Sequence, residues 1–322
     1  MKTRVKSGLL MAPLLAVVWI GGYVLLAACV VLSVFAVREF YKAFEVATVD
    51  ADRPIKPSFK VGVASVILLY TVAFITDEIF WFVIVVVMCF ALLLLNDGRS
   101  VTDSLVTMAG IFYIVLFISF IYRTDMAYPP YAIAIISGEG GDIPGPLMPY
   151  IHGFRNNFVW LIVFSAFATD IFAYFTGRAI GKHKLAPTLS PKKTVEGSIG
   201  GVVGSVVVCG LFGYFAIPAF FVHCIVIGAL GGVVSQFGDL TASAIKRRLG
   251  MKDYGSLIPG HGGLLDRIDS LLFTAPLVYL YLSIVSGWTL GGDLKTPVFR
   301  SLWESMNGTI DSSVLDILGA AW

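Results

Sequence analysis

The sequence predicts an all-α polytopic membrane protein, and three observations support that class. Hydrophobic residues make up 57% of the 322 residues and charged residues only 14%, whereas a soluble domain carries about 25% charge. The apolar residues gather in runs of about 20, the length that crosses a bilayer as a helix. Most lysines and arginines fall in alternate loops between these runs, which is typical of membrane proteins.

About nine transmembrane helices account for the apolar runs. The first run, residues 9–37, contains 29 residues, which is long for one span, and Gly21-Gly22 marks a break, so we expect a tight helical hairpin. The other expected spans are 61–76, 79–95, 105–122, 158–176, 199–217, 219–239 with a helical extension to 248, and 268–286.

The charges orient this arrangement. With nine spans, the N-terminus and the loops after the even-numbered spans hold 19 of the 23 lysines and arginines. Such an excess identifies the cytoplasmic face. We therefore expect the N-terminus in the cytoplasm and the C-terminal tail outside. The net charge of +2 is too small to indicate nucleic acid as a partner.

One stretch, residues 243–269, is unlike the rest of this apolar chain. It holds five Lys or Arg, three Asp and one His in 27 residues. Its ends continue apolar runs and should be helical, whereas the Gly and Pro residues between them cannot form a regular helix. The stretch therefore predicts a helix, a glycine-rich loop and a second helix, with a polar site where they meet.

Helical spacing brings polar side chains together on the first of these helices. Asp239 and Ser243 are four residues apart, and Lys246 and Arg247 follow Ser243 by three and four residues. Residues at these spacings share one helix face. Lys and Arg on that face could clamp phosphate, since Arg forks onto phosphate oxygens and Lys supplies a compact charge.

The second helix adds two carboxylates. Asp266 and Asp269 are three residues apart, so they share a face, and a cation between them would relieve their repulsion. Oxygen ligands of this kind suit Mg²⁺, which leaves its other positions to water and substrate phosphate. These residue types favour metal-assisted phosphoryl or nucleotidyl transfer. They leave open a basic juxtamembrane loop that binds anionic lipid headgroups.

Fourteen positions of this stretch form a fixed pattern. They are Ser243, Lys246-Arg247, Lys252-Asp253, Gly255, Pro259, His261-Gly262-Gly263 and Asp266-Arg267-Ile268-Asp269. The pattern resembles, without departure, the signature of the phosphatidate cytidylyltransferase (CDP-diacylglycerol synthase) family. The resemblance implies a polytopic membrane enzyme that makes CDP-diacylglycerol and pyrophosphate from CTP and phosphatidic acid with a divalent metal. It is specific from about 170 to 269, whereas the N-terminal spans match only in hydrophobic pattern.

Asp170 lies inside the expected span 158–176, where an ionised side chain costs at least about 2.5 kcal/mol. It must be paired, protonated or directed into a polar cavity. Two interpretations stay open: a wall of a substrate cavity, or a protonated carboxyl that bonds a neighbouring helix. An Asp followed by Ala173-Tyr174 and Gly177-Arg178 recurs in the same family, which favours the functional interpretation.

A second basic loop covers residues 190–197. Two adjacent lysines with flanking hydroxyls, placed at a helix N-terminus, suit a triphosphate contact. Taken alone, the loop is better explained by topology and by capping, with Thr194 or Ser198 as the N-cap. Because it also resembles the cytidylyltransferases, we expect it to bind substrate. The residues concerned are Lys192, Lys193, Thr194 and Glu196.

The resemblance and the residue chemistry together assign roles. The expected catalytic residues are Asp239, Ser243, Lys246, Arg247, Asp266, Arg267 and Asp269. The expected metal ligands are Asp239, Ser243, Asp266 and Asp269. The expected substrate-binding residues are Asp170, Lys192, Lys193, Thr194, Glu196, Lys252 and His261. The expected cofactor is Mg²⁺, with a second cation left open.

The expected organisation follows from these assignments. N-terminal transmembrane helices and an extracytoplasmic loop occupy 1–157, the catalytic transmembrane region 158–288, and a polar tail 289–322. The expected location is the plasma membrane with the active site facing the cytoplasm, and the partners are CTP, phosphatidic acid and membrane lipids, with a homodimer left open. Two rival functions remain: a CTP-dependent polyprenol or lipid kinase, and an ion-coupled transporter that uses Asp170 and Asp239.

Overall fold

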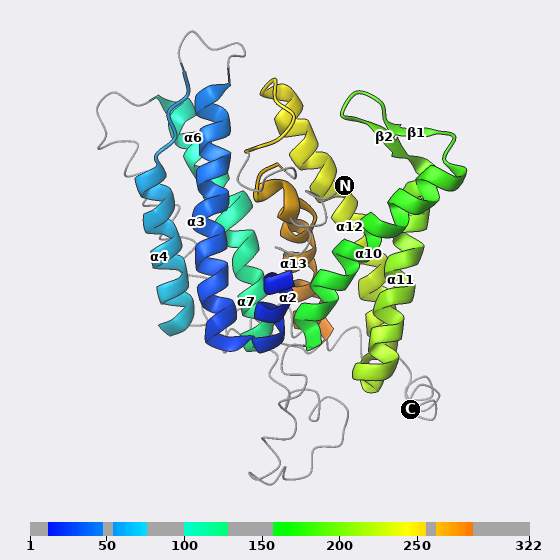
Figure 1. The fold of residues 1–322 in the computed structure, drawn as a ribbon. Coiled ribbons are helices and arrows are strands. Elements are labelled where there is room, and N and C mark those ends of the chain that lie inside the picture. Colours follow the sequence, from blue (N-terminus) through cyan, green and yellow to red (C-terminus); the bar gives the residue numbers. More distant parts are fainter. Residues whose placement is uncertain (1–11, 48–53, 76–99, 128–156, 256–261, 286–322) are drawn as a thin grey trace, which may run out of the picture.

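The computed structural model describes residues 12–47, 54–75, 100–127, 157–255 and 262–285, which are predominantly helical (Figure 1). The helices are α2 (Ala12–Ile20), α3 (Gly22–Val46), α4 (Phe59–Ile75), α6 (Val101–Gly110), α7 (Phe117–Ala127), α10 (Asn157–Ile180), α11 (Val195–Ala216), α12 (Phe221–Arg248) and α13 (Leu265–Val285). A π-helical turn, η1 (Ile111–Leu116), joins α6 to α7, and a 3-10 turn, η4 (Pro218–Phe220), joins α11 to α12. The predicted helical architecture is confirmed.

Six of the described helical segments are long and apolar enough to cross a bilayer. They are Gly22–Val46, Val101–Asp125, Phe158–Ile180, Val195–Ala216, Phe221–Arg248 and Leu265–Val285. The part of α4 at Phe59–Thr71 is apolar but shorter. The expected span 79–95 lies outside the described residues, and α2 is described over 9 residues. A polytopic helical protein is therefore confirmed, whereas the count of nine stays a prediction.

The predicted break in the first apolar run occurs at two glycines. Gly21 and Gly22 have φ angles of 63° and 54°, in a region that residues with a Cβ adopt only at a cost. The Gly22 N–H donates to the Asp125 carboxylate at 2.7 Å, which ties the turn to α7. The helix break expected within the run of 29 residues is present in the part that the structure describes, whereas a hairpin of two spans stays a prediction.

A tyrosine from α3 enters the span α6–η1–α7 just before its π-helical turn. The Tyr41 hydroxyl donates to the Thr107 carbonyl at 2.7 Å, and a Cβ at Gly110 would lie 2.3 Å from the Tyr41 ring. The ring therefore occupies the space beside Gly110. A side chain that inserts at a helix in this way distorts its backbone hydrogen bonding, and the wide turn begins at the next residue, Ile111.

Glycines let α10, α11 and α12 pack closely. A Cβ at Gly201 would lie 2.8 Å from the Thr169 carbonyl oxygen, and one at Gly228 would lie 2.9 Å from the Ser205 carbonyl oxygen. Any larger residue would force these backbones apart. The resulting three-helix unit forms the wall of the bundle that carries the second basic loop.

That loop is part of a β-hairpin that the sequence analysis did not anticipate. Strands β1 (Lys184–Ala186) and β2 (Ser190–Thr194) pair antiparallel, with Lys184 opposite Thr194 and Ala186 opposite Ser190. In Figure 1 the hairpin projects from the same end of the bundle as the last turn of α12. The two basic loops therefore lie at one end of the protein.

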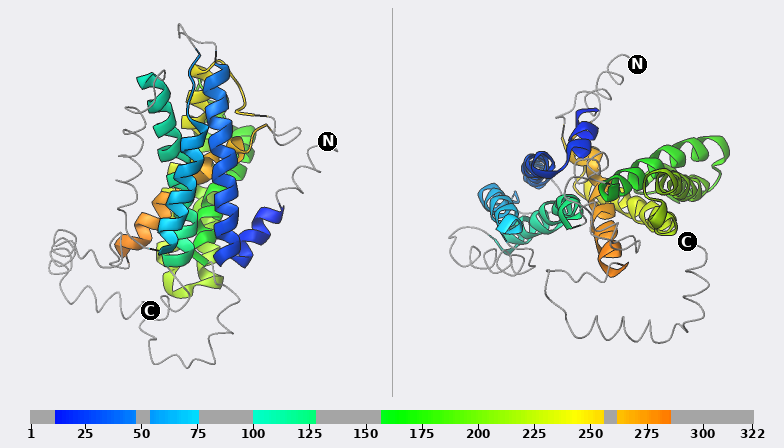
Figure 2. Two further views of the ribbon diagram at one scale, coloured as in Figure 1. Left: turned by 90° about the vertical axis from the view of Figure 1, so that its left-hand side faces the viewer. Right: turned by 90° about the horizontal axis from the view of Figure 1, so that it is seen from below.

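Helix α13 is the central helix of the fold. It contacts α12 and α10 on one side and α7 and α3 on the other, and the view from below shows it between these two groups (Figure 2). One buried cluster joins Phe40 and Tyr41 of α3 to Leu265 and Ile268 of α13. The N-terminal and C-terminal helices thus share a core. The predicted division at 157/158 falls where α10 begins and stays a prediction, and the tail 289–322 lies outside the described residues.

Candidate active site

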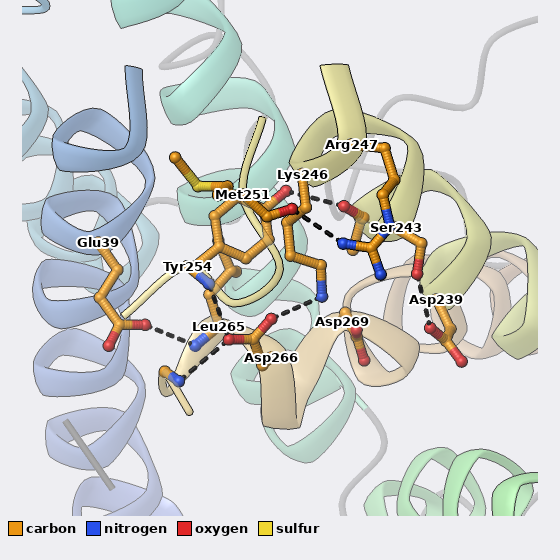
Figure 3. A network of polar contacts seen from close by, with 12 residues as sticks. Glu39, Asp239, Ser243, Lys246, Arg247, Met251, Tyr254, Leu265, Asp266 and Asp269 are labelled. Atoms are coloured by element: carbon orange, nitrogen blue, oxygen red, sulfur yellow. Dashed lines mark hydrogen bonds and ion pairs between the residues drawn. The ribbon is translucent and has the colours of Figure 1, made fainter. Parts of the chain in front are cut away.

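Helix α12 presents three of the predicted polar side chains on one face (Figure 3). The Ser243 hydroxyl donates to Asp239 Oδ1 at 3.4 Å. Lys246 follows on the same face and is buried. Arg247 instead caps the end of the helix, because its guanidinium donates to the Met251 carbonyl at 2.9 Å. The predicted face is confirmed for Asp239, Ser243 and Lys246.

The glycine-rich loop begins just after α12, at Gly250. Gly250 has a φ of 70°, the left-handed conformation that commonly terminates helices, and the Met251 N–H bonds back to the Lys246 carbonyl at 2.9 Å. The chain then turns toward α13. Tyr254 holds this turn against α12, since its hydroxyl donates to the Ala242 carbonyl at 3.3 Å. Burial raises the pKa of the Tyr254 hydroxyl, which therefore remains a neutral donor.

Asp266, in the first turn of α13, fixes the same loop. Its side chain is 4% exposed, and Oδ1 accepts from the Lys246 ammonium at 2.6 Å. Oδ2 accepts from the Tyr254 N–H at 2.9 Å and the Gly263 N–H at 3.0 Å. Both oxygens are engaged by protein donors, so the geometry gives Asp266 a structural task. Its role as a metal ligand stays a prediction.

Asp239 and Asp269 lie near each other where α12 packs against α13 (Figure 3). A Cβ on Gly238 would lie 2.6 Å from the Asp269 carbonyl oxygen, so glycine permits this approach. The Asp239 and Asp269 carboxylates interact electrostatically across the crossing. Asp269 is buried, and its Oδ1 accepts from the Ser270 N–H at 2.8 Å. Two hard carboxylates at one crossing fit a divalent cation such as Mg²⁺.

Asp170 of α10 supplies a third carboxylate to this crossing. Ser270 donates to Asp170 Oδ2 at 3.3 Å, and the Asp170 charge interacts with those of Asp239, Lys193 and Arg267. The carboxylates that the fold gathers are thus Asp170, Asp239 and Asp269. Within the described ranges, no three Asp, Glu, His or Cys side chains are already placed to hold an ion. The interhelical bond to Ser270 fits both interpretations of Asp170, so its role as a wall of the site stays a prediction.

Strand β2 of the hairpin directs one of its two lysines into the site. Lys193 of β2 forms an ion pair with Asp239 Oδ2. Lys192 is exposed, because successive residues of a strand point to opposite faces. Thr194 ends the strand as the N-cap of α11, where its hydroxyl accepts from the Gly197 N–H at 3.1 Å. The predicted cap is confirmed, and the hairpin separates the two lysines that the sequence treats alike.

The other predicted substrate-binding residues lie away from Asp170, Asp239 and Asp269 or outside the described residues. Glu196 closes the base of the hairpin: it accepts from the Lys182 N–H at 3.0 Å and pairs with His183 Nδ1 at 2.6 Å. Its oxygens are therefore used by the hairpin itself. Lys252 is exposed on the loop, and His261 lies outside the described residues. Substrate roles for these three residues stay predictions.

Glu39 of α3 belongs to the site region but was missed in the sequence. Its Oε2 accepts from the Leu265 N–H at 2.9 Å, at the N-terminus of α13, where a carboxylate is favoured by the helix dipole. A Cβ at Gly255 would lie 2.7 Å from Oε1, and one at Gly263 would lie 2.6 Å from Oε2. The only sequence signal is a charge at the end of an apolar run, which an interfacial position explains equally well.

The fold and the site define a class: a polytopic membrane protein with carboxylates and lysines converging at one end of its helix bundle, an arrangement suited to holding a cation and phosphate together. The chain belongs to the Cytidylyltransferase family, whose sequence model matches residues 2–285. This match extends well beyond the region 170–269 in which the resemblance is specific.

Three curated relatives are named as phosphatidate cytidylyltransferases. A phosphatidate cytidylyltransferase from Synechocystis sp. is 33% identical over 284 residues, covering 83% of this chain and 90% of the relative. Phosphatidate cytidylyltransferase 4, chloroplastic, from Arabidopsis thaliana is 34% identical, covering 88% of this chain and 73% of the relative. A phosphatidate cytidylyltransferase from Bacillus subtilis is 45% identical over 120 residues, which are 37% of this chain and 45% of the relative.

Proposed function

We propose that this protein is a phosphatidate cytidylyltransferase, which converts CTP and phosphatidic acid to CDP-diacylglycerol and pyrophosphate. The observation that carries the proposal is the meeting of Asp239 and Asp269 at the α12–α13 crossing, with Lys193 and Lys246 beside them. The family match over residues 2–285 and relatives of this name over most of the chain support the same reaction.

The proposed reaction is an in-line displacement at phosphorus. A phosphatidate oxygen forms a bond to the α-phosphorus of CTP, the bond from that phosphorus to the β-phosphate breaks, and pyrophosphate leaves with the electron pair. A phosphate monoester is already a nucleophile near neutral pH, so no protein base is required. The residues of this chain position the reactants and balance the developing charge.

Three side chains divide these tasks in the proposal. Asp239 and Asp269 would hold the divalent cation, for which their hard oxygens and their proximity are suited. When bound, Mg²⁺ supplies charge neutralisation to the phosphates. Lys193 lies against Asp239, where its ammonium can bind a phosphate oxygen. The proposal also includes Ser243 as a further oxygen ligand. A second cation stays open, and no contact among the described residues tests either point.

We propose the orientation of the protein in the membrane from the distribution of its basic residues. The β-hairpin, the end of α12 and the C-terminal end of α3 lie at one end of the bundle (Figure 1). Lys184, Lys192 and Lys193 lie in the hairpin, and Lys246, Arg247 and Arg248 lie at the end of α12. This basic cluster favours a cytoplasmic location for that end. We therefore infer nine spans in the plasma membrane, a cytoplasmic N-terminus and active site, and an external tail. A homodimer stays a prediction.

Labelled CTP tests the proposed reaction. Purified protein in vesicles that contain phosphatidic acid should transfer the α-phosphate of CTP into lipid and leave the γ-phosphate in pyrophosphate. The double variant Asp239→Asn/Asp269→Asn serves as the inactive control. Transfer of the γ-phosphate would instead identify a lipid kinase. Ion-driven uptake by the vesicles without nucleotide turnover would identify a transporter, and either result would overturn the proposal.

A further inference from the structure

The Tyr113 hydroxyl is a buried polar group without a hydrogen-bond partner among the described residues. Such groups are rare in native structures, because burial removes the water that would otherwise bond them. Tyr113 lies within the π-helical turn η1, Ile111–Leu116, and π-helical turns occur frequently at functional sites. The proposed reaction assigns it no task so far.

Aromatic contacts fix the Tyr113 ring beside the α12–α13 crossing. Its centroid lies 6.2 Å from that of Phe117 and 6.0 Å from that of Phe273, both edge to face. Phe273 is one helical turn after Asp269, and its ring would lie 3.1 Å from a Cβ at Gly238. The ring is therefore held against the point where Asp239 and Asp269 meet.

The hydroxyl lies in the electrostatic range of these carboxylates and bonds to neither. It is close enough for electrostatic interaction with Asp269 and Asp239, yet neither carboxylate is its hydrogen-bond partner. The group that completes its hydrogen bonding is therefore not among the described residues. A substrate phosphate beside the carboxylates offers acceptor oxygens, and a phenol is a suitable neutral donor to an oxyanion.

We propose that Tyr113 is a substrate-binding residue whose hydroxyl donates a hydrogen bond to a phosphate oxygen of a substrate held at Asp239 and Asp269. The inference rests on the proposed function and adds a contact from the N-terminal half of the chain. Both CTP and phosphatidic acid carry phosphate, and the experiment distinguishes them.

Tyr113→Phe removes this hydroxyl alone, and Tyr281→Phe is a matched control. The Tyr281 hydroxyl bonds His223 at 2.9 Å, and Tyr281 lies 12 residues after Asp269 on α13, about 18 Å along the helix axis. We expect Tyr113→Phe to lower kcat/KM about tenfold or more and Tyr281→Phe to change it less than about twofold. The substrate whose KM rises identifies the phosphate that is bound.

Thermal unfolding separates binding from a structural role. Without substrate, Tyr113→Phe should melt at or above the wild-type temperature, because an unpaired buried group is removed. Unchanged kinetics with both substrates would overturn the inference, as would a melting temperature that falls together with activity. If the wild type transfers no cytidylyl group, the proposed function fails. The rise in melting temperature on adding CTP with Mg²⁺, or phosphatidic acid, then tests the Tyr113 contact separately. Equal rises in wild type and Tyr113→Phe overturn the contact, and a smaller rise in the variant supports it.

Discussion

Glu39 of α3 and Leu265 of α13, 226 residues apart, are joined by a hydrogen bond of 2.9 Å from the Leu265 N–H to Glu39 Oε2. The bond fixes the N-terminus of the helix that carries Asp266 and Asp269. Gly255 and Gly263 press against the same carboxylate, so the glycine-rich loop is shaped against α3. The site therefore depends on a helix outside the region where its motif lies.

Gly255→Ala should lower both melting temperature and activity, the latter about tenfold, by a clash with Glu39. The three nearest atoms to the added Cβ all belong to Glu39, at 2.7, 3.1 and 3.4 Å. Glu39→Ala removes them, so Gly255→Ala should cost much less in that background than in the wild type. A double-mutant cycle in thermal unfolding measures this coupling. Purely additive losses would show that the loop does not rest on Glu39.

Asp266→Asn and Asp269→Asn should fail in different ways. The first leaves the buried Lys246 ammonium without its counter-charge, a change that costs about 3–5 kcal/mol of stability. The second relieves repulsion with Asp239, so stability should hold while activity falls about 10²-fold and the Mg²⁺ requirement rises.

Melting temperature and a Mg²⁺ titration of CMP incorporation into lipid distinguish these two effects. Asp253→Asn, at an exposed position of the same loop, is the control for a lost charge. Should Asp266→Asn raise the Mg²⁺ requirement while its melting temperature stays unchanged, Asp266 would be a metal ligand after all.

Lys193→Gln should lower kcat/KM at least tenfold, because Lys193 contacts Asp239 at the site. Lys192→Gln removes the same charge from the neighbouring exposed residue, so it should lower kcat/KM no more than about twofold. The comparison cancels any effect of net charge on association. Equal losses in the two variants would mean that the loop acts through its overall charge.

Single cysteines test the orientation in a background without the four native cysteines. Cysteines at Thr188 and Arg248, both exposed and at the same end of the bundle, should react with an impermeant reagent from the cytoplasmic side. A cysteine at Pro218, in the turn at the other end, should react from outside. Reaction of Thr188 and Arg248 variants from opposite faces would separate the two basic loops and remove the proposed site.

Apolar runs and helix spacing predict much of this fold. The expected spans 158–176, 199–217 and 268–286 correspond to α10, α11 and α13, whose ends lie within about four residues of the prediction. Spacing also places Asp239, Ser243 and Lys246 on one face. Both predictions succeed for the same reason: the bounds of a helix and the residues that share its face depend on residues close together in the chain.

Features that depend on contacts between residues far apart in the sequence could not be predicted from apolar runs and helix spacing. Asp266 and Asp269 share a helix and a motif, yet the Tyr254 and Gly263 N–H groups draw Asp266 into the loop. Asp170 approaches the site because glycines pack α10 against α11 and α12. Glu39 carries no local pattern at all. The short hairpin was missed because five loop residues with two lysines resemble an irregular connection.

The length of α12 sets the depth at which the chemistry takes place. Its 28 residues extend about 42 Å, whereas the hydrocarbon core is about 30 Å thick. If the helix enters the core near Phe221, Asp239 lies near the opposite boundary, where lipid headgroups begin. Extracting a lipid into water costs about 0.8 kcal/mol per CH₂, so two long acyl chains would cost more than about 20 kcal/mol. A reacting centre at this depth removes that cost: the nucleotide approaches from water, while the acyl chains remain in the bilayer before and after reaction.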